Sequence, residues 1–232
     1  MEPMRRELEQ ELMNDFSQVE AYAAADFSAG DASMISRLEG YIYELGKNQE
    51  KFNCIVDLGC GPGNITERLA LRWPNSRIIG IDGSDPMVRM AKLRKKNNLD
   101  NIKGLNYLCI KIGSKVSDLS FISNSVNLIV SNSCLHHFHT PDLFWECIKY
   151  LAAPKALVFH RDLRRPSTIN NALELTKKYT LDSPNVLKAD YLASLKAAFS
   201  VNEVRSQLKA ANLNHLNVSE IDDRYLEIFG LL

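Results

Sequence analysis

Three glycines at alternate positions are the first residues in this sequence that indicate chemistry. Gly59, Gly61 and Gly63 follow the apolar run 54–58, and a helix-like pattern begins directly after them. Glycine permits positive φ and lets a ligand touch the backbone, and a helix that starts beyond the loop directs free N–H groups toward an acceptor. One glycine would indicate only a tight turn, but G-x-G-x-G between a strand and a helix predicts a ligand-binding loop.

Two classes of ligand compete for this loop. A nicotinamide or flavin dinucleotide is typical of the spacing G-x-G-x-x-G, which serves a pyrophosphate. Here the loop reads G-C-G-P-G, and Asp57 stands two residues before Gly59. The next apolar run ends in Asp82, whose carboxylate could accept hydrogen bonds from both hydroxyls of a ribose. The alternative for Asp82 is an acid at a helix N-terminus, beside Ser84.

The glycine loop belongs to a regular alternation of strands and helices. Five short apolar runs predict strands, with helical patterns between them: "CIVDL", "RIIGI", "LNYLCI", "VNLIVSN" and "ALVFH". This alternation is typical of a parallel sheet covered on both faces. Near the end of the chain, "LNHLNVSEI" and "YLEIF" are too close for a parallel crossover, which predicts an antiparallel hairpin. The sequence thus predicts an α/β, doubly wound, mostly parallel seven-stranded sheet with a C-terminal antiparallel hairpin and helical cap elements.

Helical patterns also lie outside this alternation. Apolar residues at steps of three and four predict a helix over 5–25 and a second one that ends near Gly46. Asn64 and Glu67 have the spacing of a capping box at the start of the helix after the glycine loop. We expect a single domain in four parts: an N-terminal helical cap (1–48), a cofactor-binding core (50–162), a helical insertion or lid (166–212) and the terminal hairpin (213–232).

Composition narrows the function classes. The 232 residues contain 28 Lys and Arg and 28 Asp and Glu, and this zero formal charge argues against binding nucleic acid or a membrane by bulk charge. The five cysteines form no C-x-x-C pair and predict reduced thiols in a cytoplasmic protein. We find no signal peptide, and no run approaches the roughly 20 apolar residues of a membrane span. The sequence does not indicate an oligomeric state.

Taken together, "VDLGCGPGN" and "IIGIDGSDPM" resemble the S-adenosylmethionine site of class I methyltransferases. The resemblance extends to "VNLIVSNSCLHHF", which is similar to the fourth-strand motif of the UbiE-like small-molecule branch. It implies a Rossmann-like fold, S-adenosyl-L-methionine as cofactor, and methyl transfer to oxygen, nitrogen or carbon of a small molecule by in-line displacement. The methyl donor is already activated, so the protein mainly holds the acceptor in line and excludes water.

The resemblance also implies roles for nine residues. Asp57 would support the amino group of the methionyl part, and Asp82 would hold the ribose. Gly83 and Met87 would lie beside the adenine. The remaining five residues would line the methionyl part: Gly59, Cys60, Gly61, Gly63 and Asn132. One stretch departs from the family, which commonly shows Gly-Asp-Ala after the third strand. Here Lys111 and Ile112 occupy that neighbourhood, and a backbone carbonyl or Asp118 would have to meet the adenine amino group instead.

Candidate catalytic residues follow the fourth and fifth predicted strands. His136 and His137 could act as a general base or donate to the substrate, or they could tie their loop to the next helix. Asp162 is the other candidate base. Although His139 lies close by, we expect no metal, because the sequence shows no matching carboxylate pattern and the family carries such a histidine pair without metal.

Other residues could shape the substrate side. Three arginines could recognise an acidic group or could form salt bridges within the loop: Arg161, Arg164 and Arg165. Aromatic residues in 21–28 and 190–200 lie outside the sheet repeat, so these segments predict a lid over the substrate, although such residues are also typical of a core. Two alternatives to a small-molecule methyltransferase remain: a nucleic-acid or protein methyltransferase, and a non-catalytic module that binds S-adenosylmethionine.

Overall fold

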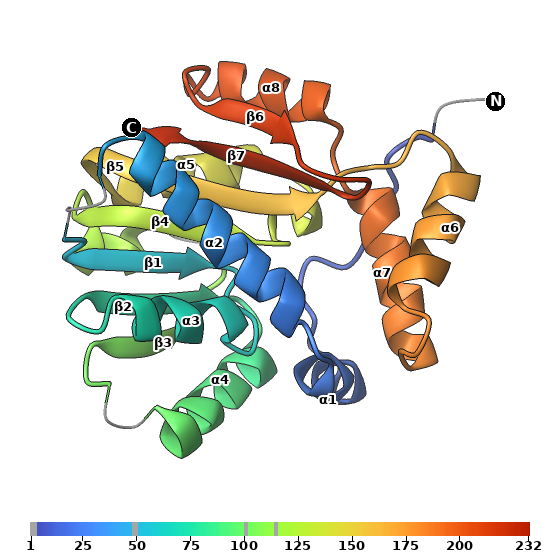
Figure 1. Cartoon of the computed structure of the whole chain (residues 1–232), viewed down its shortest axis with the longest axis horizontal. Coiled ribbons are helices and arrows are strands. Elements are labelled where there is room, and N and C mark those ends of the chain that lie inside the picture. Colours follow the sequence, from blue (N-terminus) through green and yellow to red (C-terminus); the bar gives the residue numbers. More distant parts are fainter. Residues whose placement is uncertain (1–3, 48–50, 100–101, 114–115) are drawn as a thin grey trace.

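The chain is built around one seven-stranded sheet (Figure 1). The computed structural model describes residues 4–47, 51–99, 102–113 and 116–232. The strands are β1 (Cys54–Leu58), β2 (Arg77–Asp82), β3 (Leu105–Cys109), β4 (Val126–Asn132), β5 (Ala152–Leu163), β6 (Asn217–Glu220) and β7 (Tyr225–Leu231). Their order is β3-β2-β1-β4-β5-β7-β6, and β7 runs antiparallel to both β5 and β6. The predicted parallel core and terminal hairpin are confirmed.

Helices cover both faces of the sheet, which explains why the central strands are apolar throughout. The helices are α1 (Phe16–Ala24), α2 (Ser28–Glu44), α3 (Asn64–Arg72), α4 (Asp85–Asn98), α5 (Asp142–Leu151), α6 (Ile169–Tyr179), α7 (Asn185–Ala197) and α8 (Val201–Ala210), with short 3₁₀ helices at Val116–Ile122 and Leu135–His137. One core joins α2, α3 and α4 to the side chains of one face of the sheet, and another joins α5 and α8 to the opposite face. Ile55 faces the first core and Val56 the second, because successive side chains of a strand alternate.

The N-terminal segment differs from its prediction. Within the predicted helix 5–25, only α1 is helical, and residues 4–13, which we call the strap, have no helical turn. The strap bonds to distant parts of the chain instead: Met4 N–H donates to the Ser167 carbonyl at 2.9 Å, and Glu7 N–H donates to the Lys196 carbonyl at 3.1 Å. Tertiary contacts therefore replace the local hydrogen bonds that the apolar spacing predicted.

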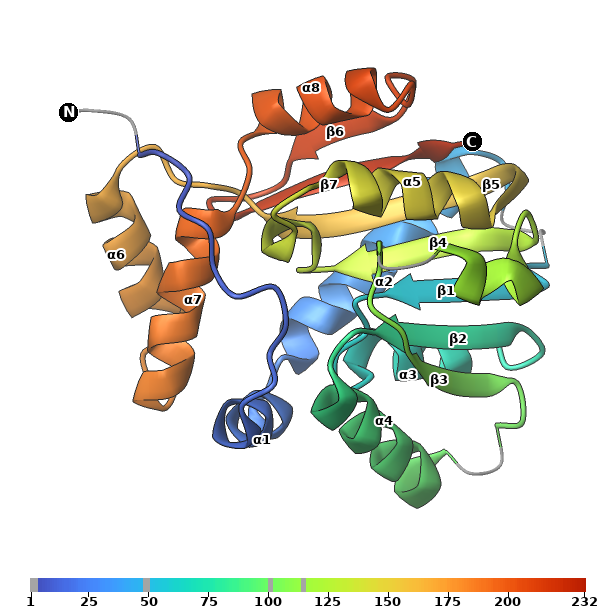
Figure 2. The same cartoon turned by 180° about the vertical axis from the view of Figure 1, so that it is seen from behind.

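The strap, α1, α6 and α7 lie beyond the carboxyl ends of the parallel strands (Figures 1 and 2). A small third core joins α6 to α7, with Met4 of the strap packed against it. α2 begins at this end of the sheet and runs back across its face to the start of β1 (Figure 1). The predicted insertion is helical, but its last helix, α8, packs on the sheet, so only α6 and α7 extend past the strand ends.

Among the described residues, no helix is long and apolar enough to cross a membrane.

Candidate active site

The glycine loop leaves β1 where the strand order reverses between β1 and β4, which is the usual ligand position in an open parallel sheet. Gly59 has a φ of +70°, and a Cβ there would lie 2.2 Å from the Sγ of Cys134. Gly61 has a φ of +51°, but apart from its two chain neighbours no described residue has a heavy atom within 4 Å of where its Cβ would be. The loop is therefore packed closely at Gly59 and open at Gly61, where a ligand could contact the backbone.

One detail of the loop corrects the sequence prediction. Asn64 is not the N-cap of α3, because Gly63 takes that place and Asn64 is the first helical residue. The capping box with Glu67 is not formed, and Glu67 instead pairs with Arg94 of α4 at 2.9 Å. The N–H groups in the first turn of α3, directly after the glycine loop, therefore have no side-chain cap.

Asp82 joins the glycine loop to the start of α4. Its Oδ2 accepts a hydrogen bond from Gly61 N–H at 2.8 Å, and its Oδ1 accepts one from Ser84 N–H at 2.8 Å. Burial raises the pKa of this carboxyl, while these backbone donors lower it. A carboxylate has about four lone-pair sites, so two further hydrogen bonds, as from a ribose, can still be accepted.

Asp57 lies beneath the loop and is fully buried. Its Oδ2 accepts a hydrogen bond from the Thr66 hydroxyl at 2.6 Å, and burial raises its pKa to about 7, with smaller contributions from Asp82 and Asp31. Asp31 of α2 is a third buried carboxyl, whose pKa burial raises to about 6 although Arg68 lies 3.8 Å away. Asp31 was missed from sequence because it lies in the N-terminal region, with no motif around it.

The cysteines of this region are packing residues. Cys60 and Cys134 are both buried, and burial, followed by the charge of Asp82, raises the pKa of each thiol. Neither sulfur therefore has the thiolate character of a nucleophile.

The strap covers the side of the site assigned to adenine. A Cβ on Gly83 would lie 2.7 Å from Cδ2 of Leu12, and the Ser84 hydroxyl donates to the Met13 carbonyl at 2.6 Å. Met87 is buried in the first turn of α4 behind this contact. The residues that resemble an adenine pocket are thus brought together, with Leu12 lying against them.

Lys111, which departs from the family pattern, pairs with a residue of the same strap. Lys111 Nζ lies 2.8 Å from Oε2 of Glu11. Asp118, the other acid considered for this position, is exposed in the 3₁₀ helix Val116–Ile122. The carboxylate that the described structure places near this position is therefore Glu11 of the strap, which is already paired with Lys111.

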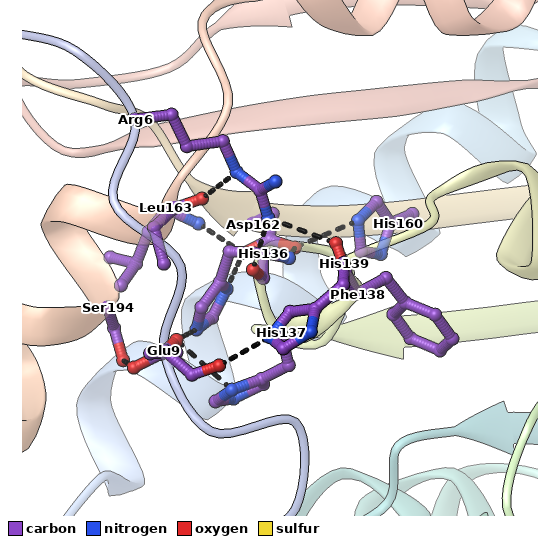
Figure 3. Close-up of polar contacts among 11 residues, drawn as sticks. Arg6, Glu9, His136, His137, Phe138, His139, His160, Asp162, Leu163 and Ser194 are labelled. Atoms are coloured by element: carbon purple, nitrogen blue, oxygen red, sulfur yellow. Dashed lines mark hydrogen bonds and ion pairs between the residues drawn. The ribbon is translucent and has the colours of Figure 1, made fainter.

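His136 and Asp162 form a buried pair at the ends of β4 and β5 (Figure 3). His136 Nδ1 contacts Asp162 Oδ1, the His136 backbone N–H donates to Oδ2 at 3.2 Å, and His160 Nε2 lies 3.3 Å from Oδ2. Burial opposes both charges, but their attraction raises the pKa of His136 and holds that of Asp162 well below its usual range. Asp162 therefore orients His136 and is a poor base itself.

Glu9 of the strap faces the two adjacent histidines and was missed from sequence. Its Oε1 lies 3.1 Å from His137 Nδ1 and 3.5 Å from His136 Nε2, and its Oε2 accepts from the Ser194 hydroxyl at 3.1 Å. Arg6, also in the strap, donates to the carbonyls of His136 and Phe138 at 2.9 and 3.0 Å. No sequence pattern identified Glu9, because it lies in a segment expected to be an ordinary amphipathic helix.

Two further candidates, Asn132 and His139, lie near the same strand ends. Asn132 ends β4 and is partly exposed at the same strand ends. His139 contacts the Glu9 carbonyl through Nε2 at 2.6 Å and lies outside the cluster around Glu9 Oε1.

The three arginines at the end of β5 and directly after it are held by the protein itself. Arg161 is buried against Glu227 at 2.6 Å, a carboxylate that Arg37 of α2 also contacts at 2.7 Å. Arg165 donates to Glu203 at 2.7 Å, and Arg164 donates to the Asp222 carbonyl at 2.8 Å. These contacts agree with the salt-bridge interpretation of the arginines and fasten α2 and the hairpin to the sheet.

Comparison with known proteins assigns the core of the chain. Residues 55–154 match the family described as Methyltransferase domain. The match assigns these residues, which are less than half of the chain, to a class I methyltransferase domain. The sheet order and terminal hairpin of the chain are those of the Rossmann-like methyltransferase fold, so the resemblance drawn from the sequence motifs is confirmed.

Relatives and solved structures resemble the methyltransferase domain to different extents. A trans-aconitate 2-methyltransferase from Afipia carboxidovorans is 62% identical over 40 residues, which cover 17% of this chain and 16% of that protein. The match thus spans about a sixth of the length of this curated relative. A SAM-dependent methyltransferase from Aquifex aeolicus has a TM-score of 0.60 at 18% identity, covering 94% of this chain and 99% of that one.

The plantazolicin methyltransferase BpumL, solved with a triazolic desmethylPZN analog and SAH, has a TM-score of 0.70 at 13% identity, covering 93% of this chain and 90% of that one. At such identities the structural likeness to the methyltransferase domain establishes the fold alone.

Proposed function

We propose that this protein is an S-adenosylmethionine-dependent methyltransferase that acts on a small-molecule acceptor. The observation that carries the proposal is the open space at Gly61, which lies beside the partly bonded carboxylate of Asp82 at the point where the strand order reverses. The match of residues 55–154 to a methyltransferase family and the name of the Afipia relative support the same activity.

The residues present fit the cofactor on two of its three sides. The glycine loop and Asn132 would line the methionyl part, Asp57 would support its amino group, and Asp82 would hold the ribose. On the third side Leu12 lies against Gly83, so we infer that the strap shifts when adenine binds beside Gly83 and Met87. When bound, the cofactor would supply a methyl group activated by a sulfonium charge.

The acceptor would lie toward the ends of β4 and β5. We assign His136, oriented by Asp162, and His137 as the candidates that receive a proton from the acceptor, where its nucleophilic atom carries one. The strap, α1 and α7 would exclude water from this side. α6 and α7 with the N-terminal residues would thus act as the lid, and residues 50–162 as the cofactor-binding core. Five free cysteines support a cytoplasmic location.

A metabolite extract incubated with the protein and label-bearing S-adenosylmethionine tests this proposal. We expect a labelled small molecule, identified by mass, that is absent when Asp82→Ala replaces the wild type. Cofactor binding without any labelled product would favour the non-catalytic alternative. Labelled nucleic acid or protein in place of a small molecule would favour a macromolecular substrate.

A further inference from the structure

Three metal-ligating atoms converge where the strap crosses the end of β4. The imidazole nitrogens of His136 and His137 and a carboxylate oxygen of Glu9 all lie within 4.8 Å of one another (Figure 3). We propose that these three residues form a binding site for a zinc-like divalent cation. The sequence alone predicts no such site, because its carboxylate comes from the opposite end of the chain.

The two separations from Glu9 to the histidines suit a metal. Zinc binds histidine nitrogen and carboxylate oxygen at about 2.0–2.2 Å, so neighbouring ligand atoms of a tetrahedral site lie about 3.4 Å apart. Glu9 Oε1 is 3.1 Å from His137 Nδ1 and 3.5 Å from His136 Nε2. The remaining separation, between the two histidines, is known only to lie within 4.8 Å, so a cation that binds between them would draw the histidines toward Glu9.

The ligands are already oriented by outer contacts. His136 uses Nδ1 to contact Asp162, which leaves Nε2 directed at Glu9, and metal-bound histidines almost always make such an outer contact to a carboxylate, a carbonyl or water. The second oxygen of Glu9 accepts from the Ser194 hydroxyl at 3.1 Å. Two ligands thus have the supporting contact that a metal site requires.

The strongest indication is that two of these atoms are buried and face each other without a hydrogen bond of ordinary geometry. Among the described residues, Glu9 Oε1 and His137 Nδ1 have no hydrogen bond of ordinary geometry, although they are only 3.1 Å apart. Buried polar atoms normally have a partner. A cation between them would satisfy both at once.

Three protein ligands are typical of zinc sites that keep a fourth position for water or a substrate. If the proposed function holds, an oxygen or nitrogen of the methyl acceptor could take that position, and the two histidines would then act as metal ligands and not as bases. The binding of metal itself does not depend on methyl transfer, so failure of one proposal leaves the other standing.

The test is a calorimetric titration of the full chain, stripped of metal with a chelator, with ZnCl₂. We expect one equivalent of zinc per chain, and at least tenfold weaker binding in Glu9→Gln and in His137→Gln. Asp162→Asn leaves the three ligands in place but alters the outer contact of the His136 ring, together with the contacts of Asp162 to the His136 backbone N–H and to His160, and should weaken binding 10- to 100-fold. Glu11→Gln in the strap and His215→Gln on the surface are matched controls that should bind zinc as the wild type does, and circular dichroism checks that each variant is folded.

Substitution with Co²⁺ identifies the ligands independently. We expect visible absorption of a four- or five-coordinate nitrogen and oxygen site, which is lost in His137→Gln. The proposal is overturned if the wild type binds no stoichiometric zinc, or if both cluster variants bind it as tightly as the controls. A thiolate charge-transfer band from Co²⁺ would also overturn it, because the metal would then be held by cysteine.

Discussion

One oxygen of the Asp82 carboxylate lies 2.8 Å from the backbone nitrogen of Gly61, so the acid at the end of β2 fixes the loop at the end of β1. The same carboxylate would hold the ribose in the proposed function. Asp82→Ala should weaken the binding of S-adenosylhomocysteine by at least ~1–3 kcal/mol, the scale for losing hydrogen bonds to a charged group. Calorimetric titration measures this loss.

Asp85→Ala is the matched control for Asp82, because the Asp85 side chain is exposed and pairs with Arg89 in the same helix. The free energy of unfolding of both variants is also measured without ligand. This measurement shows how much Asp82 stabilises the glycine loop, apart from its contribution to binding the ribose. Unchanged affinity in Asp82→Ala would refute the ribose assignment.

Alanine at two positions of the glycine loop should have different main effects, on ligand binding at Gly61 and on stability at Gly59. Gly61→Ala places a methyl group in open space at positive φ, so we expect a stability loss of ~1–2 kcal/mol and at least tenfold weaker binding of S-adenosylhomocysteine. Gly59→Ala places its methyl group 2.2 Å from Cys134 Sγ, so we expect a larger loss, of about 2–4 kcal/mol. Urea unfolding and calorimetry measure the two effects.

Gly40→Ala is the control for this pair. It lies inside α2 with no atom within 4 Å of the added Cβ, and should stabilise the protein by about 0.5–1 kcal/mol. If Gly61→Ala lost stability but kept full affinity, the space at Gly61 would not be part of the cofactor site.

Asp57 should make stability fall as the pH rises. Its pKa is about 7 in the folded chain and about 3.9 when unfolded, so between these values the folded state holds a proton that the unfolded state has released. The free energy of unfolding therefore decreases with pH across this window and levels off above pH 7. Asp57→Asn, which cannot ionise, should remove roughly 1–3 kcal/mol of the decrease between pH 5 and pH 8.

Urea unfolding at both pH values checks this expectation. Asp31 and Asp82 also face this region, so Asp31→Asn is measured in parallel and should remove a smaller part of the decrease. An Asp57→Asn variant with the same pH dependence as the wild type would contradict the buried, protonated state of Asp57.

The N-terminal residues and α7 should respond to the cofactor. Tyr22 and Phe27 are in ring contact at 4.8 Å, and Glu7 and Glu9 bond to α7. Hydrogen exchange over residues 15–30 and 185–200 should slow when S-adenosylhomocysteine binds, while α5 on the sheet face serves as the reference.

Deleting residues 1–30 should abolish turnover and weaken cofactor binding but leave the sheet folded. Equal exchange with and without ligand would show that these segments only complete the fold.

The sheet was predictable because its signals are local. Apolar runs such as 54–58 and 126–132 match β1 and β4 residue for residue, and the short link before Tyr225 required a hairpin. The glycine loop and Asp82 were found for the same reason, since the loop directly follows β1 and Asp82 is the last residue of β2.

The strap and its contacts were not predictable from local pattern. Leu8 and Leu12 have helical spacing, yet Leu8 is largely exposed and Leu12 lies against Gly83, which is far away in the sequence. Glu9 contacts His136 and His137 because the strap crosses the strand ends before α2 runs back across the sheet. Only a structure brings together such residues from opposite ends of the chain.

The central claim is that this chain binds S-adenosylmethionine and not a dinucleotide. Calorimetric titration of the wild-type protein with S-adenosylhomocysteine and, separately, with NAD tests it directly. We expect one molecule of S-adenosylhomocysteine per chain, bound more tightly than NAD. Tighter binding of NAD would contradict the account.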